Sequence, residues 1–340
     1  MRHLTPVPLS TRPRVSVVVP CYNYGHYLPA AVASALDQEG VDVEVLIVDD
    51  CSTDDSAAVA FGLAAEDPRV DVLVHETNRG HIATYNDGLA KVSGDYVALL
   101  SADDLLAPGA LTRAVSLMEA QPSVGLVYGA ITTFVEQPPP ERAAREGWSV
   151  WAGEEWLERV CRRGRNVIVS PEAVMRTELV RELDGYDPRH PHAADMLMWT
   201  RAAARADVGR VNGPRQAAYR VHGANMHLVR FAGQLTDYRA TEQAFEALFD
   251  AEPSTARLRR PARTALGREV LLAAEVARAG GEEIGEATAY ALAVAPDLGS
   301  TPLARRCGTE GQSRARRAWV RGSSALRWRY RAWRWRRWGL

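Results

Sequence analysis

The sequence has 340 residues, of which 46% are hydrophobic and 24% charged, and its formal net charge is −1. This composition predicts a soluble globular protein with one sizeable core. No stretch reaches the roughly 20 consecutive apolar residues of a membrane-spanning helix, and residues 1–14 lack the apolar run of a signal peptide. The four cysteines form no CxxC pair, which argues against a zinc ribbon or disulfide framework and favours reduced thiols in the cytoplasm.

Short apolar runs alternate with stretches of helical periodicity in the first 130 residues. Runs rich in β-branched residues predict buried strands, and apolar residues at helical spacing predict amphipathic helices. Ser52 or Thr53 is predicted to cap the second helix. In chain order we expect strands at 15–20, 43–48, 70–75, 96–100 and 125–128, and helices at 27–38, 57–65, 82–92 and 110–120.

This alternation predicts an α/β fold with a Rossmann-like, mostly parallel sheet, whose ligands bind beyond the carboxyl ends of the strands. Alanine, leucine and glutamate dominate residues 241–304, which predicts a helical appendage broken near Pro253, Pro261, Gly280 and Pro296. We therefore divide the chain into a catalytic domain (1–240), a helical appendage (241–312) and a basic aromatic tail (313–340).

Polar residues follow three of the predicted strands. Asp103 and Asp104 come directly after one, where carboxylates suit Mg²⁺ or Mn²⁺ bridging a diphosphate. The alternative is that either aspartate caps a helix after Leu105. Asp50 at a neighbouring strand end can accept a hydrogen bond from a pyrimidine imide, and Tyr22 can stack on the base. Loop solvation for Asp50 and core packing for Tyr22 are the alternatives.

Five segments in order resemble the signature of family 2 glycosyltransferases. They are VSVVVPCYNYGHYL, VEVLIVDDCSTDDS, NRGHIATYNDGL, GDYVALLSADDLLAPGAL and AADMLMWTRAA. The resemblance covers roughly residues 14–225. It implies the GT-A fold, a nucleotide-sugar donor, a divalent metal (Mn²⁺ or Mg²⁺) and an inverting displacement at the anomeric carbon.

The resemblance also implies roles for single residues on the donor side. It places Pro20, Tyr22 and Asn23 around the nucleobase, Asp50 on the imide edge, Ser52 close by, and Asn78 near phosphate or ribose. Turn chemistry alone also accounts for Asn78.

The family's metal motif, Asp-x-Asp, falls on Ser101 and Asp103, so the first carboxylate is missing. We assign Asp103 as the principal metal ligand, with Asp104 in support and Ser101 as a ribose or water contact. His222, in a segment similar to the family's Tyr-Arg-x-His, is predicted to complete the metal shell or contact the diphosphate.

Asp195 matches the family's general base, although Ala194 stands where relatives carry a glutamate. One carboxylate there would take the acceptor proton. Capping of the helix at 196–206 is the alternative for Asp195, and the two roles are compatible.

The tail interleaves arginines with Trp319, Trp328, Trp333, Trp335 and Trp338. We predict that it lies in an anionic bilayer interface, which would make the enzyme peripheral to the membrane. Nucleic-acid binding and docking on an acidic protein face are the alternatives.

Taken together, the residues and the resemblance predict a metal-dependent inverting glycosyltransferase. UDP-sugars are the favoured donors, and the acceptor is unassigned, a lipid-linked glycan or a small natural product being candidates. A nucleotidyltransferase is a weaker alternative, because CYNYGHYL is not a glycine-rich basic loop. A sugar-nucleotide-binding scaffold, impaired at Ser101 and Ala194, is the non-enzymatic alternative.

Overall fold

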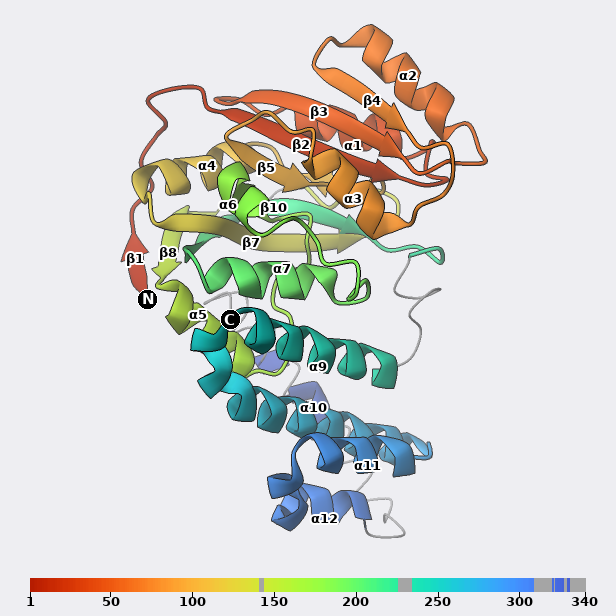
Figure 1. The fold of residues 1–340 in the computed structure, drawn as a ribbon, viewed down its shortest axis with the longest axis vertical. Helices are drawn as coiled ribbons and strands as arrows, with labels where there is room; N and C mark the ends of the chain where they lie inside the picture. The colour runs from red at the N-terminus through yellow and green to blue at the C-terminus, as the bar shows by residue number, and fades with distance from the viewer. Residues whose placement is uncertain (141–143, 226–233, 309–319, 321, 327–328, 331–340) are drawn as a thin grey trace. The chain divides into compact units, whose positions relative to one another are not determined.

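The computed structural model describes all residues except 141–143, 226–233, 309–319, 321, 327–328 and 331–340 (Figure 1). The chain divides into two compact units. The first is Met1–Trp156 with Ile168–Val229, and the second is Leu157–Val167 with Arg230–Leu340. The short segment 157–167 thus belongs with the helices of the second unit, while the division at 240 and 312 remains a prediction.

The first unit is built on one mixed sheet. Its strands follow the order β1-β8-β10-β7-β9-β5-β2-β3-β4, with β6 paired to β10. Strands β5, β2, β3 and β4 are parallel throughout, whereas β9 joins β5 to β7 through antiparallel pairs. The strands are β1 (Arg2–Leu4), β2 (Arg14–Cys21), β3 (Asp42–Asp49), β4 (Val70–Val74), β5 (Tyr96–Leu99), β6 (Leu105–Leu106), β7 (Val124–Phe134), β8 (Gly147–Trp151), β9 (Val174–Arg176) and β10 (Asp207–Arg220).

Helices cover both faces of the parallel part of this sheet. Side chains alternate along each strand, so Val17 and Val19 of β2 join one core with α1 and α4, while Val18 faces α3. The helices are α1 (Leu28–Leu36), α2 (Ser56–Glu66), α3 (His81–Leu89), α4 (Ala110–Ala120), α6 (Thr177–Glu182) and α7 (Ala194–Ala203), and α5 (Gly153–Cys161) crosses into the second unit. The predicted strands and helices of the first 130 residues are confirmed, with ends shifted by a few residues.

Helix starts were predicted less well than helix bodies. Helix α2 begins at Ser56 after Asp55, so neither Ser52 nor Thr53 caps it, and Ser52 instead donates to Asp49. Leu105 opens the short strand β6 rather than a helix, which excludes helix capping by Asp103 or Asp104. These errors share a cause, because the side chains that could cap bond distant residues. Ser52 accepts the Asn23 N–H, Asp104 accepts the Arg220 N–H, and Asp103 contacts His222.

Helix α3 approaches the sheet closely at Gly88. A Cβ at this position would lie 2.4 Å from Val18 Cγ1 and 3.1 Å from Val48 Cγ2, both on buried β-branched side chains. Gly88→Ala should therefore lower the free energy of unfolding by about 1–3 kcal/mol, measured by urea denaturation. Gly62→Ala is the matched control on helix α2, where nothing lies within 4 Å. If both variants gain the ~1 kcal/mol expected from helix propensity, the close packing at Gly88 is contradicted.

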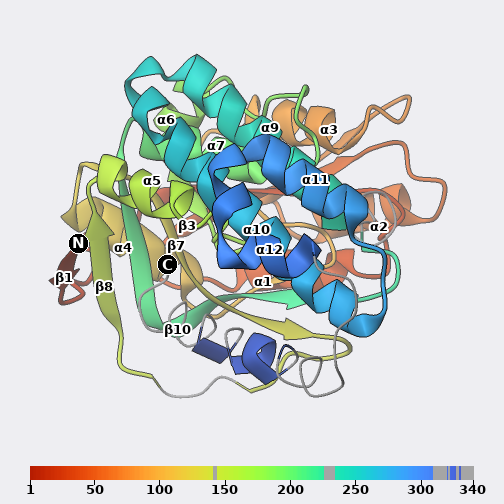
Figure 2. The same ribbon diagram turned by 90° about the horizontal axis from the view of Figure 1, so that it is seen from below.

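The second unit is helical. Helix α10 contacts α9, α11 and α12 (Figure 2). The core of this second unit contains Leu271, Ala274, Ala291 and Leu298. The elements are α9 (Gln234–Ala251), the 3-10 turn η1 (Pro253–Leu258), α10 (Arg259–Gly280), α11 (Gly285–Val294), the 3-10 turn η2 (Pro296–Ser300) and α12 (Pro302–Gly308).

The predicted breaks at Pro253, Gly280 and Pro296 are confirmed, and the one at Pro261 is wrong. Pro261 lies in the first turn of α10, where the backbone N–H has no acceptor within the helix. A proline there removes no hydrogen bond and does not interrupt the helix.

Candidate functional site

The loops after β2 and β3 are tied together by side-chain hydrogen bonds. The Ser52 hydroxyl donates to Asp49 Oδ1 at 2.5 Å and accepts the Asn23 backbone N–H at 2.9 Å. Asn23 has a φ of 58° and its Oδ1 accepts the Thr53 backbone N–H at 2.8 Å. Asn23 and Ser52 therefore hold the two loops beside each other at the carboxyl edge of the sheet.

The other predicted base contacts lie at the same edge. Pro20 pairs with Val48 across the β2–β3 ladder and is half-buried. Tyr22 is 46% exposed, so it is not a core residue, and its ring is available for stacking. Ser101 follows β5, and its carbonyl accepts the Asp104 backbone N–H at 3.0 Å.

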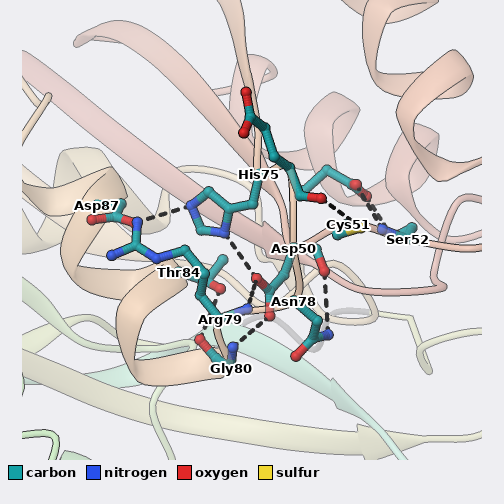
Figure 3. Close-up of polar contacts among 11 residues, drawn as sticks. Asp50, Cys51, Ser52, His75, Asn78, Arg79, Gly80, Thr84 and Asp87 are labelled. Atoms are coloured by element: carbon teal, nitrogen blue, oxygen red, sulfur yellow. Dashed lines mark hydrogen bonds and ion pairs between the residues drawn. The ribbon is translucent and has the colours of Figure 1, made fainter.

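Asp50 is buried and holds the loop at 78–80 (Figure 3). Its Oδ1 accepts from His75 Nδ1 at 2.8 Å and from the Arg79 backbone N–H at 2.7 Å, and its Oδ2 accepts from the Gly80 N–H at 2.8 Å. Asn78 Nδ2 donates to the Asp50 carbonyl at 3.2 Å. Burial alone would raise the pKa of Asp50, but these hydrogen bonds outweigh it and hold the pKa below its ordinary value. The carboxylate is therefore ionised at neutral pH, and solvation in an open loop does not describe it.

Asp103 and His222 meet at the other side of this edge. His222 Nε2 lies 3.0 Å from Asp103 Oδ2, and Asn225 Nδ2 lies 3.4 Å from the same oxygen. The rings of Tyr24 and Tyr27 pack around His222, with centroids 5.5 Å and 5.4 Å away. The structure thus brings together two residues that are separated by 119 positions in the sequence.

Asp104 turns away from this pair. Its Oδ1 accepts the Arg220 backbone N–H at 2.8 Å, and the residue is 1% exposed. Burial and the neighbouring Asp103 charge raise the pKa of Asp104 well above its ordinary value. Within the described ranges no group of three histidine, cysteine or acidic side chains is arranged to hold a metal. Asp104 is thus placed to order the backbone beside Asp103.

The residues present fit a divalent metal that shares its ligands with a substrate. Asp103 offers a carboxylate oxygen and His222 an imidazole nitrogen, and these two atoms lie 3.0 Å apart. Mn²⁺ and Mg²⁺ usually take one or two protein ligands and complete their shell with water and phosphate oxygens. A carboxylate with an imidazole suits Mn²⁺ better than Mg²⁺.

Asp195 lies in the first turn of α7, after the N-cap residue Ala193, which excludes the alternative that Asp195 caps this helix. Its carboxylate instead accepts hydrogen bonds from the hydroxyls of Ser170 and Tyr186. Ser170 holds a φ of 118°, a conformation that costs a non-glycine residue energy. Burial raises the pKa of Asp195, and the two hydroxyl donors oppose that rise. A carboxylate so held is oriented and poised to accept a proton.

Tyr219 of β10 lies within the field of all three candidate carboxylates. Burial, followed by the charges of Asp104, Asp103 and Asp195, raises the pKa of Tyr219 to about 12. The same three charges and burial raise the pKa of Tyr85 on α3. Asp195 and Asp103 thus both act electrostatically on Tyr219 and Tyr85.

Glu172 is a further acidic residue that the sequence did not reveal. It is 1% exposed, and its Oε1 accepts the Val169 N–H at 2.8 Å. Its Oε2 has no hydrogen-bond partner among the described residues. Burial raises the pKa of Glu172 to about 7, helped by the charge of Asp195.

The raised pKa of Glu172 predicts that the free energy of unfolding depends on pH. Because the folded pKa (about 7) exceeds the ordinary 4.5, wild-type stability falls as pH rises from about 4.5 through 7. Glu172→Gln removes this titration, so the variant should gain up to about 3 kcal/mol relative to wild type between pH 5 and pH 8. Urea denaturation across that range measures the difference, and a difference that stays flat would contradict the buried ionisation.

Several contacts of the site gave no sequence signal. Ser170, 25 residues before Asp195, stands in no recognisable motif. His75 ends a predicted strand as an ordinary polar residue, and Tyr186 follows a turn. Asn86, in a segment that resembles the family signature, makes two hydrogen bonds of 2.8 Å to the Tyr186 backbone. Of the residues in these contacts that lie outside the predicted site, only Asn86 stands in a segment that resembles the family signature.

The predicted tail site lies outside the described residues, since Trp319, Trp328, Trp333, Trp335 and Trp338 all fall in the omitted ranges. Among the residues that are described, no helix combines the length and apolar character required to cross a bilayer.

Known proteins with similar sequences indicate the family that this region resembles. The sequence model of glycosyl transferase family 2 matches residues 16–183. An uncharacterized glycosyltransferase of Nostoc sp. is 28% identical over 238 residues, covering 68% of this chain and 71% of the relative. This match identifies residues 16–183 as a family 2 glycosyltransferase region.

Solved structures agree at the level of the fold. TarS of S. aureus, in complex with UDP-GlcNAc, is 20% identical with a TM-score of 0.59, over 75% of this chain and 72% of TarS. The mannosyltransferase PcManGT of Pyrobaculum calidifontis, in complex with GDP-Man and Mn²⁺, is 21% identical with a TM-score of 0.52, over 95% and 88% of the two chains. The predicted α/β GT-A fold with C-terminal helices is confirmed.

The family 2 match ends at residue 183, before Asp195 and His222. The match therefore covers the donor-side loops, Ser101, Asp103 and Asp104. The roles of Asp195 and His222 rest on the geometry described above and on the resemblance of their own segments.

Proposed function

We propose that this chain transfers a sugar from a nucleotide-diphosphate sugar to an acceptor hydroxyl with inversion at the anomeric carbon. UDP-sugars are the favoured donors. The observation that carries the proposal is the meeting of Asp103 with His222 at the strand ends. The Asp195 carboxylate, which the hydroxyls of Ser170 and Tyr186 orient, supports it.

The donor is proposed to bind along the carboxyl ends of β2, β3 and β5. The exposed Tyr22 ring supports stacking on the base, and the ionised Asp50 supports an N–H contact to it. Pro20, Asn23 and Ser52 shape this pocket, while Asn78 and Ser101 lie toward the ribose and phosphates. The relatives TarS and PcManGT, whose structures hold UDP-GlcNAc and GDP-Man, support a nucleotide-sugar donor in general terms.

Asp103 and His222 would hold the divalent metal, which neutralises charge on the departing diphosphate when it is bound. The Mn²⁺ in the PcManGT complex supports a metal in this fold. Asp104 is proposed to support the site by fixing the Arg220 backbone next to Asp103.

Asp195 is proposed to act as the general base. The acceptor oxygen forms a bond to the anomeric carbon as the bond from that carbon to the nucleoside diphosphate breaks, and the acceptor proton passes to the Asp195 carboxylate. Such a base contributes about 10²–10⁴ to the rate. Ser170 and Tyr186 orient the carboxylate for this transfer.

Calorimetric titration with UDP, dTDP, GDP and ADP tests the donor site. Each is added with and without Mn²⁺ to the wild type and to Asp103→Ala, with Asp71→Ala on the exposed face of β4 as a surface control. We expect Mn²⁺-dependent binding of one nucleotide that is lost in Asp103→Ala and retained in Asp71→Ala. The absence of binding by all four nucleotides contradicts the proposal.

A sugar-nucleotide-binding scaffold is the second candidate, because Ser101 and Ala194 replace two family carboxylates. It predicts nucleotide binding without release of nucleoside diphosphate from any donor sugar. Turnover of the donor that the titration identifies would exclude the scaffold.

A further inference from the structure

Four residues from four segments form a closed ring of contacts beside the candidate base pocket (Figure 3). His75, after β4, bonds Asp50 Oδ1 through Nδ1 at 2.8 Å, and its Nε2 lies 3.0 Å from Asp87 Oδ2 on α3. Asp87 also pairs with the Arg79 guanidinium. The ring closes because the Arg79 backbone N–H donates to Asp50 Oδ1 at 2.7 Å.

The members of the ring differ in their access to a ligand. The side chains of His75 and Asp50 are each 5% exposed, whereas those of Asp87 and Arg79 are 30% and 51% exposed. His75 lies between two carboxylates, away from solvent. Any effect of His75 on a ligand therefore passes through Asp50 or through the 78–80 loop.

The hydrogen bonds leave Asp50 one acceptor position. Each carboxylate oxygen can accept two hydrogen bonds. Among the described residues, Oδ1 accepts from His75 and from the Arg79 amide, while Oδ2 accepts from the Gly80 amide alone. The imidazole, together with the Arg79 and Gly80 amides, thus fixes the rotation of the carboxylate about its Cβ–Cγ bond and keeps the second lone pair of Oδ2 in one direction.

We infer that His75 is a positioning residue that orients Asp50 Oδ2 to accept an N–H from the nucleobase, and so sets which base the site prefers. Asp87 Oδ2 lies 3.0 Å from the other imidazole nitrogen without hydrogen-bond geometry, and Asp87 pairs with Arg79. This inference rests on the proposed donor site. It adds that base discrimination depends on a residue that does not touch the nucleotide.

Three variants of His75 separate the two contacts of the ring. Asparagine places an amide N–H near the position of Nδ1 and keeps the bond to Asp50. Glutamine places its amide near Nε2 and keeps the contact with Asp87. Phenylalanine keeps the ring volume and loses both contacts.

Calorimetry with UDP and CDP in Mn²⁺ supplies the readout, because cytosine lacks the imide N–H of uracil at N3. The wild type and His75→Asn should bind UDP at least about tenfold more tightly than CDP. The reason is that only uracil can donate its N3–H to the charged Asp50 carboxylate. His75→Gln and His75→Phe should lose about tenfold in UDP affinity and most of this preference, with CDP affinity little changed. A purely structural role would lower both affinities together.

The outcomes that overturn the inference are distinct. Equal binding of UDP and CDP by the wild type shows that Asp50 does not read the base N–H, and leaves the proposed function standing. An unchanged UDP preference in both His75→Gln and His75→Phe removes His75 from the selection. His75→Asn remains informative if the other two variants do not fold, since loss of the preference there contradicts the inference. Failure of the wild type to bind any nucleotide overturns the proposed function and this inference with it.

Discussion

Asp195→Asn should lower the turnover of the donor about a thousandfold and leave nucleotide binding within about twofold. Asparagine keeps the shape of the side chain and can still accept a hydroxyl hydrogen bond through its one carbonyl oxygen, but it cannot take a proton from the acceptor. The measurement is the release of nucleoside diphosphate from the donor sugar, with water as the acceptor until a better one is found. Calorimetry on the same variant checks that the donor side is intact.

Ser170→Ala is the matched test of how Asp195 is tuned. The Ser170 hydroxyl lowers the pKa of Asp195, so its removal should raise that pKa further. The base acts in its ionised form, and the acid limb of the rate profile should therefore move to higher pH. Activity of Asp195→Asn within tenfold of wild type would refute the base assignment, and an acid limb of Ser170→Ala that moves to lower pH would refute the tuning.

Arg220→Lys should lower the free energy of unfolding by about 3 kcal/mol. The Arg220 guanidinium is buried between the rings of Tyr27 and Phe134, 4.5 Å and 4.4 Å from their centroids. Its Nε donates to the Asp103 carbonyl at 2.9 Å, and its Nη1 lies 3.2 Å from the carbonyls of Val135 and Glu136. A lysine ammonium lacks the several N–H donors that the planar guanidinium directs at these carbonyls, so the carbonyls would lose hydrogen-bond donors.

Arg215→Lys is the control on the same strand. The Arg215 guanidinium reaches the Pro139 carbonyl at 2.9 Å from a half-buried position, and its replacement should cost less than about 1 kcal/mol. Urea denaturation compares the two variants. Equal losses for Arg220→Lys and Arg215→Lys would show that stacking between Tyr27 and Phe134 contributes nothing specific. The Arg220 guanidinium is committed to backbone carbonyls.

Part of the site could be predicted because local chemistry fixes it. Buried β-branched runs gave the strands of the parallel half, and parallel strands end at one edge, so Asp50, Tyr22 and Asp103 had to lie near one another. The capping predictions for Ser52 and Asp195 failed for the opposite reason. Each could have accepted a hydrogen bond from a nearby backbone N–H, but Ser52 accepts from the distant Asn23 N–H, and Asp195 accepts from the hydroxyls of Ser170 and Tyr186.

The sequence by itself determined the family, the alternation of strands and helices, and the chemical types at the strand ends, because periodicity and motif order are properties of neighbouring residues. The tertiary structure alone decided which carboxylates work together. Asp103 meets His222, Asp104 meets the Arg220 backbone, and His75 joins Asp50 to Asp87. Protonation and orientation in these groups depend on burial and on partners that are distant in the chain, and no local pattern encodes either.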